Sequence, residues 1–87
     1  MRIEEVVWDD WNEEHIAGHG VSSMEVEEVV FTHPLRARRM RDDKFAVYGQ
    51  TDAGRYLTVI VAPRPNNAYY VVTARDMNNN ERKQYSN

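Results

Sequence analysis

Apolar and polar positions in the second half of the chain follow the short periods of β-strands. Segments 45–50 and 55–62 flank Thr51-Asp52-Ala53-Gly54, a connection suited to a hairpin. Residues 57–62 are almost uniformly apolar, which places this strand at the centre of a sheet. Segment 68–75 is rich in Tyr and Val and predicts the last strand. In segment 35–40 arginines alternate with apolar residues, which is typical of an edge strand blunted by charge.

The first third of the chain predicts a short strand followed by two helices. Segment 3–8 contains Val6-Val7-Trp8, and Asp9 or Asp10 can cap the helix that follows it. Gly20 suits a left-handed residue at the end of that helix.

Either Ser22, in the pattern Ser22-x-x-Glu25, or Ser23 can cap a second helix that runs to about Phe31. Its apolar positions recur every three or four residues from Met24 onwards, while three acids are expected to face water: Glu25, Glu27 and Glu28. His33-Pro34 ends this helix, and Asn78-x-x-Glu81 caps a short C-terminal one. We therefore expect one α+β domain over residues 1–87, with a short N-terminal strand and two helices packed on a mostly antiparallel sheet of about four strands, and a short C-terminal helix.

Composition indicates a soluble protein of a reducing compartment. The chain has no cysteine, no apolar run long enough to span a membrane, and an acidic start unlike a signal peptide. These features predict a cytoplasmic protein without membrane association.

Charge is unevenly distributed along the chain. Residues 1–33 carry nine acids and one base, a net charge of −8, whereas residues 34–87 carry ten bases and five acids, a net charge of +5. This asymmetry indicates either an anionic partner for the second half or neutralisation of one half by the other.

Two histidines are candidates for chemistry. His15 and His19 stand four residues apart and share one helix face with Trp11. No cysteine and no intervening glutamate accompany them, so a metal site is disfavoured and no metal or cofactor is predicted. A structural role against tryptophan and a role in proton transfer or RNA contact both remain open.

Arginine dominates the basic residues, and tyrosines are interleaved with it. Arginine matches phosphate oxygens in a bidentate manner, and exposed aromatic rings stack on RNA bases. Each tyrosine taken alone is more typical of strand packing.

Three segments resemble the BrnT family of ribonuclease toxins from type II toxin–antitoxin systems. They are Trp8-Asp9-x-x-Asn12-x-x-His15-Ile16-x-x-His19-Gly20-Val21-Ser22; Tyr48-Gly49-Gln50-Thr51-Asp52-x-Gly54-Arg55-Tyr56-Leu57; and Val72-Thr73-Ala74-Arg75-Asp76-Met77 followed by Glu81-Arg82-x-x-Tyr85.

The resemblance implies a RelE-like fold, metal-independent cleavage of RNA, and a partner antitoxin of the ribbon-helix-helix type. The predicted catalytic residues are His15, His19, Arg55 and Arg75, with the imidazoles transferring protons and the arginines holding the phosphate. The predicted RNA-binding residues are Arg36, Arg38, Arg82 and Tyr85.

The chain departs from the family pattern at Gly18 and at Trp11-Asn12, where many members carry a basic residue. This departure implies either that His15 takes over the role of the missing basic residue or that the nuclease activity is weakened. The alternative interpretation is a non-catalytic RNA- or protein-binding module derived from the toxin fold.

Overall fold

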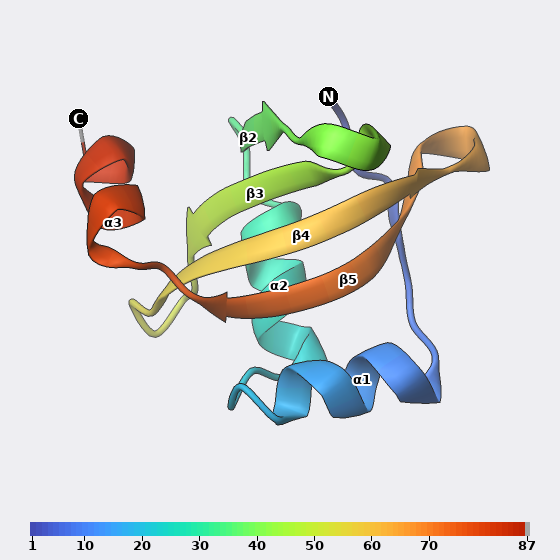
Figure 1. Ribbon diagram of the computed structural model, residues 1–87, viewed down its shortest axis with the longest axis horizontal. Coiled ribbons are helices and arrows are strands. Elements are labelled where there is room, and N and C mark those ends of the chain that lie inside the picture. Colours follow the sequence, from blue (N-terminus) through green and yellow to red (C-terminus); the bar gives the residue numbers. More distant parts are fainter. Residues whose placement is uncertain (87) are drawn as a thin grey trace.

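Five strands form one sheet in the computed structural model of the chain, which describes residues 1–86 (Figure 1). They are β1 (Glu5–Val7), β2 (Arg36–Arg39), β3 (Phe45–Gln50), β4 (Tyr56–Arg64) and β5 (Ala68–Asp76). Their spatial order is β1-β5-β4-β3-β2, so the apolar strand β4 is central and the arginine-rich strand β2 lies at an edge, as the sequence predicts. Strands β2 to β5 pair antiparallel. The sheet has five strands, one more than expected, because β1 adds a short parallel pairing to β5.

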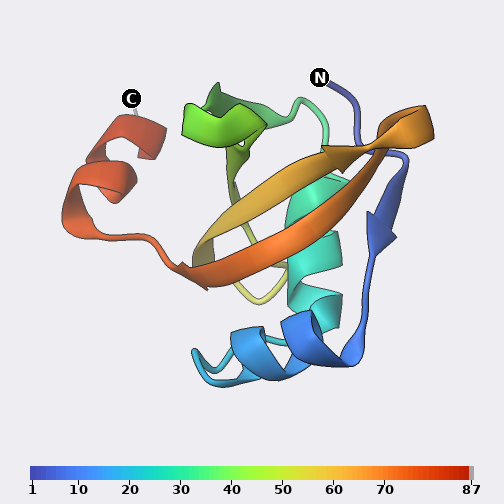
Figure 2. The same ribbon diagram turned by 45° about the vertical axis from the view of Figure 1, so that its right-hand side comes forward.

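Three helices complete the fold: α1 (Asp10–Ala17), α2 (Ser23–Val30) and α3 (Asn79–Ser86). Helices α1 and α2 cover one face of the sheet, and α3 lies at the other side, beside one end of the strands (Figure 1; Figure 2). Asp9 caps α1 through a reciprocal pair with Asn12, and Ser22 caps α2 in the same way with Glu25. None of the described helices is long and apolar enough to cross a membrane.

The core fills the space between the sheet and helices α1 and α2. Side chains at alternate positions of the strands, such as Val47 and Val59, are fully buried against Ile16 and Val29. A Cβ atom at Gly49 would lie 2.8 Å from the Val29 side chain, so the helix approaches the strand too closely for any larger residue. Met24, predicted on the apolar face of α2, is 69% exposed.

The turn between α1 and α2 has the hydrogen bonds of a Schellman motif. The amide of Val21 donates to the Ile16 carbonyl at 3.0 Å, and that of Gly20 donates to Ala17 at 2.9 Å. Gly20 has φ +71°, the left-handed conformation that its sequence context predicts. The turn fixes His19 as the last residue before the chain reverses.

Helix α1 also covers an open strand edge. Strand β1 pairs only with residues 68–70, so the outer edge of β5 beyond Tyr70 has no strand partner. Asn12, which is fully buried, donates from Nδ2 to the carbonyls of Val71 at 3.1 Å and Val7 at 3.0 Å. One side-chain amide thereby donates hydrogen bonds to a backbone carbonyl of β1 and to a carbonyl at the open edge of β5.

We expect Asn12→Ala to lower the free energy of unfolding by about 2–4 kcal/mol, because it leaves buried carbonyls without donors. Urea denaturation at pH 7 measures this change. Asn80→Ala, on an exposed position of α3, is the control and is expected to change stability by less than about 0.5 kcal/mol. Equal stability of the two variants would contradict the proposed importance of the Asn12 amide.

Candidate functional site

The two candidate histidines both contact the edge of β5. His15 Nε2 lies 3.1 Å from Thr73 Oγ1, and His19 Nδ1 lies 3.0 Å from the Ala74 carbonyl oxygen. Because a carbonyl only accepts, Nδ1 of His19 carries the proton. In the neutral ring the lone pair is therefore on Nε2, which has no hydrogen-bond partner among the described residues. Both side chains are exposed. The His19 ring is therefore oriented by its Nδ1 hydrogen bond while its Nε2 atom is accessible from solvent.

Aromatic contacts order these imidazoles further. The Trp11 ring stacks on His15 with a centroid separation of 5.0 Å and an interplanar angle of 6°. The two imidazoles meet edge to face at 5.2 Å. Within residues 1–86 no group of three or more His, Asp or Glu side chains is arranged to hold a metal ion.

Sheet register places several predicted site residues on the face opposite α1 and α2. One cross-strand row consists of Arg36, Tyr48, Thr58 and Arg75. The next row runs from Arg38 through Ala46 and Ile60 to Thr73, the contact of His15. Two residues along a strand span about 7 Å, so the His15 contact and Arg75 are neighbours on one face.

Arg75 divides its hydrogen-bond donors between the fold and the solvent. Nη1 donates to Glu81 Oε1 at 2.7 Å and to the Asp76 carbonyl at 3.2 Å, and Nη2 donates to Glu81 Oε2 at 3.0 Å. A guanidinium has five N–H groups, so Nε and the second hydrogen of Nη2 remain available. Because its side chain is 41% exposed, Arg75 can bind an anion while Glu81 orients it.

Glu81 is the acceptor on which this arrangement converges. It also accepts from the Thr58 hydroxyl at 3.0 Å and from the Asn78 amide at 2.9 Å. The hydrogen bonds from Arg75, with smaller contributions from the Asn78 amide and Thr58, lower the pKa of Glu81 from 4.5 to about 2 against the opposing effect of burial. Glu81 is therefore a fixed anion at neutral pH and a weak base.

Arg55 uses all of its donors within the protein. Nε and Nη2 bind the Asp76 carboxylate, and Nη2 also reaches the His19 carbonyl at 3.4 Å. Nη1 donates to the Gly20 carbonyl at 2.6 Å and to Glu25. The pKa of Arg55 is raised, chiefly by its hydrogen bond with Asp76. This geometry fastens the turn after α1 to the end of β5 and leaves no N–H group for a phosphate.

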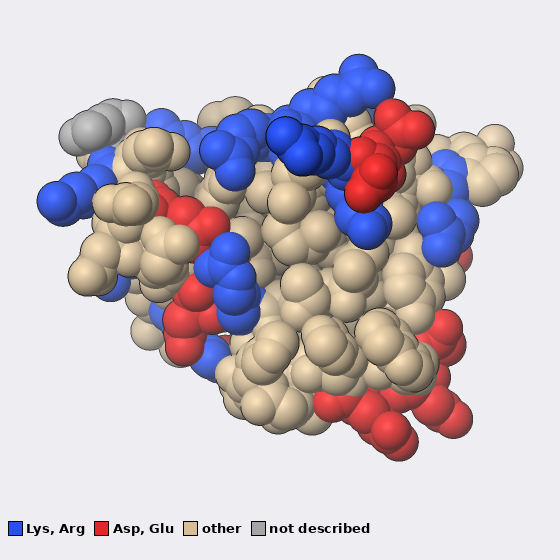
Figure 3. Space-filling model, viewed as in Figure 1, with Lys and Arg blue, Asp and Glu red and all other residues tan. Residues whose placement is uncertain are grey.

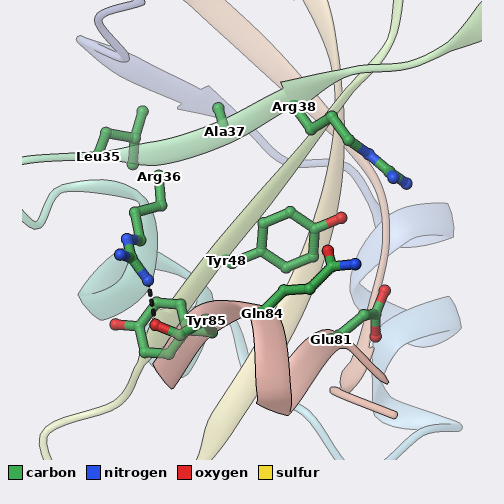
Figure 4. A pocket seen from close by; sticks show the side chains of 8 residues that line it. All are labelled: Leu35, Arg36, Ala37, Arg38, Tyr48, Glu81, Gln84 and Tyr85. Carbon is green, nitrogen blue, oxygen red and sulfur yellow. Dashed lines mark hydrogen bonds between the residues drawn. The ribbon is translucent and has the colours of Figure 1, made fainter. Parts of the chain in front are cut away.

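Arg36, Arg38 and Tyr85 line a cavity of about 380 Å³ between β2, β3 and α3, together with Tyr48 and Glu81 (Figure 4). The Arg36 guanidinium lies 4.9 Å from the centre of the Tyr85 ring and donates to the Tyr85 carbonyl. Arg82 is not part of this cavity. It stacks on Tyr56 at 3.8 Å and borders a separate hollow with Asn79 and Lys83.

The surface retains the charge asymmetry of the sequence. Figure 3 shows basic side chains along the upper rim over β2, mixed with acidic ones at the turn that follows it, and acidic side chains over the start of α1. Ion pairs connect the two halves only at Arg55–Glu25 among the described residues. Internal neutralisation therefore accounts for little of the asymmetry.

The sequence profile of one family, described as the ribonuclease toxin BrnT of type II toxin–antitoxin systems, matches residues 8–81. The chain belongs to the BrnT family. The fold is also similar to that of the Brucella abortus ribonuclease toxin BrnT, with a TM-score of 0.68 and 19% sequence identity over 85% of this chain and 96% of the other. No curated protein matches the sequence.

Three residues of this BrnT face were not predicted as site residues: Tyr48, Glu81 and Gln84. Glu81 was identified as part of a helix cap and of the family motif, and it does belong to the cap, since its backbone amide donates to Asn78 Oδ1 at 2.9 Å. Tyr48 could have been found from the register of β2 and β3, which places it opposite Arg36. Gln84 depends on where α3 lies, and no local pattern gives that position.

Glu81→Gln is expected to destabilise the protein by about 2 kcal/mol at pH 7, because it removes the charge paired with Arg75. The lowered pKa of Glu81 means that its stabilisation is complete above pH 4.5 and disappears as the pH falls towards 2. The unfolding free energies of the unmodified protein and of Glu81→Gln, measured at pH 7, 4 and 2.5, should therefore differ most at pH 7 and become similar at pH 2.5. Glu14→Gln, at an exposed position of α1, serves as control. A stability difference independent of pH would refute the assignment to Glu81.

Proposed function

We propose that this chain is an active, metal-independent endoribonuclease that acts on cellular RNA in the cytoplasm. The observation that carries the proposal is that His15 and His19 contact the edge of β5 at the two residues that precede Arg75, which keeps donors free for an anion. These are the groups that cleavage by the RNA's own 2′-hydroxyl requires: a base, an acid and a cation at the phosphate.

In the proposed reaction His19 Nε2 removes the proton from the 2′-hydroxyl, and the resulting oxygen attacks the adjacent phosphorus. Arg75 stabilises the charge of the pentacoordinate phosphate through its Nε and Nη2 hydrogens. His15 in its protonated form returns a proton to the departing 5′-oxygen. The products are a 2′,3′-cyclic phosphate and a 5′-hydroxyl, and no cofactor takes part.

We assign Arg55 a positioning role. Its contacts with the carbonyls of His19 and Gly20 support this assignment, because they hold the backbone from which the His19 ring projects. Arg36, Arg38 and Tyr85 are proposed to hold the RNA strand at the β2 rim, where basic side chains are concentrated. Arg82 would contribute only to an extended strand, since it faces a separate hollow.

A ribbon-helix-helix protein is proposed as the antitoxin. Membership of a type II toxin–antitoxin family supports a protein partner, and the acidic surface at the start of α1 suits a basic one. Co-expression of the protein encoded by the neighbouring reading frame should relieve growth arrest if this partner is correct.

A non-catalytic binding module is the second candidate. The complete use of Arg55 by protein acceptors favours it, because one expected phosphate ligand is lost. Inducible expression in a bacterium, followed by incubation of purified protein with RNA and EDTA, separates the two candidates. Growth arrest with chelator-resistant cleavage supports the nuclease, whereas normal growth with bound but intact RNA supports the module.

Arg75→Ala and His19→Ala are each expected to slow cleavage at least about 100-fold, because each removes one element of transition-state stabilisation. Initial rates on a short RNA in EDTA give the measurement, with circular dichroism to verify folding. Arg2→Ala removes an exposed arginine far from this face in sequence and should leave the rate unchanged. A folded Arg75→Ala protein that cleaves at the normal rate would remove Arg75 from the mechanism.

A further inference from the structure

The cavity between β2, β3 and α3 has features that phosphate binding does not use. Its volume of about 380 Å³ falls in the lower part of the ~300–1,000 Å³ range of small-ligand sites. The Tyr48 ring stands in the middle of the space, between the Arg36 and Arg38 side chains of β2 and the Gln84 side chain of α3 (Figure 4). A half-buried aromatic ring offers a flat, uncharged group a stacking surface that a phosphate does not use.

The polar side chains that line this cavity differ in whether they have hydrogen-bond partners within the protein. Glu81 is held by Arg75, Thr58 and the Asn78 amide. In contrast, the Gln84 amide and the Tyr48 hydroxyl have no hydrogen-bond partner among the described residues, although both line the cavity. An exposed amide offers a donor and an acceptor side by side, the pattern that pairs with a base edge in a bidentate manner.

We propose that this cavity is a nucleobase pocket that prefers bases whose Watson–Crick edge carries an exocyclic amino group beside a ring-nitrogen acceptor, that is adenine or cytosine. Gln84 pairs with the amino group and the ring nitrogen, and the Tyr48 ring packs against the base.

The position of the pocket connects it with the proposed nuclease site, and the inference rests on that proposed function for its biological role. Tyr48 and Arg75 belong to one cross-strand row, with Thr58 between them. A base in the pocket would thus place its own nucleotide's phosphate or a neighbouring one towards Arg75.

The test measures the binding of nucleoside monophosphates to the 87-residue chain by NMR or calorimetry. It involves no cleavage step. AMP and CMP should bind about tenfold more tightly than GMP, UMP and ribose 5-phosphate, the last reporting phosphate binding alone. Gln84→Leu should abolish this preference while retaining weak binding of all five compounds. Tyr48→Ala should weaken AMP and CMP about tenfold, whereas Tyr48→Phe, which keeps the ring, should lose much less.

Asn80→Leu, at an exposed position of the same helix outside the cavity, is the matched control and should preserve the preference. Equal affinities for all five compounds, or an unchanged preference in Gln84→Leu, would overturn the pocket assignment. Base-selective binding by a protein that leaves RNA intact would support the pocket and reject the nuclease. RNA cleavage without base-selective binding would do the opposite.

Discussion

The unpaired edge of β5 is the constraint on which the rest of the molecule depends. Strand β1 is only three residues long, so the carbonyls of β5 beyond Tyr70 need partners from elsewhere. Helix α1 and the turn after it supply them: Asn12 donates to Val71 and His19 to Ala74. Because residues three and four positions apart lie above one another on a helix, His15 falls between these two contacts. Covering the edge and presenting two imidazoles are therefore consequences of the same packing.

Fixing α1 against β5 also determines which arginines remain available to a ligand. Both Arg55 and Arg75 pair with carboxylates near the end of β5, and the pKa of each is raised. Arg55 uses all five hydrogens within the protein, on Asp76, Glu25 and the carbonyls of the turn that ends α1, whereas Arg75 keeps two. Counting donors thus separates a positioning arginine from a ligand-binding one, a distinction that charge alone does not make.

Local patterns predicted most of the fold because the relevant signals are short-range. The hairpin at Gly54, the left-handed Gly20 and the cap at Ser22 each depend on a few adjacent residues. The acids of α2 show where this reasoning fails. Glu25, Glu27 and Glu28 were expected to face water, yet they accept hydrogen bonds from Arg55, Trp8 and the Asp52 amide. Those partners lie 19 to 30 residues away in sequence, and no helical periodicity identifies them.

The same limit applies to the candidate site, and it explains which residues were missed. The histidines could be proposed from their spacing and Arg75 from family resemblance, but the packing of α1 against β5 is what brings them to one stretch of that strand. Tyr48 and Gln84 gain significance only when α3 lies across the end of that face, and α3 contributes no fully buried residue that would predict its position. Its position is instead set by polar contacts, chiefly those of Glu81 with Arg75 and Thr58. The ion pair that orients the proposed phosphate ligand therefore also holds the helix that forms the cavity, so the two features depend on one carboxylate.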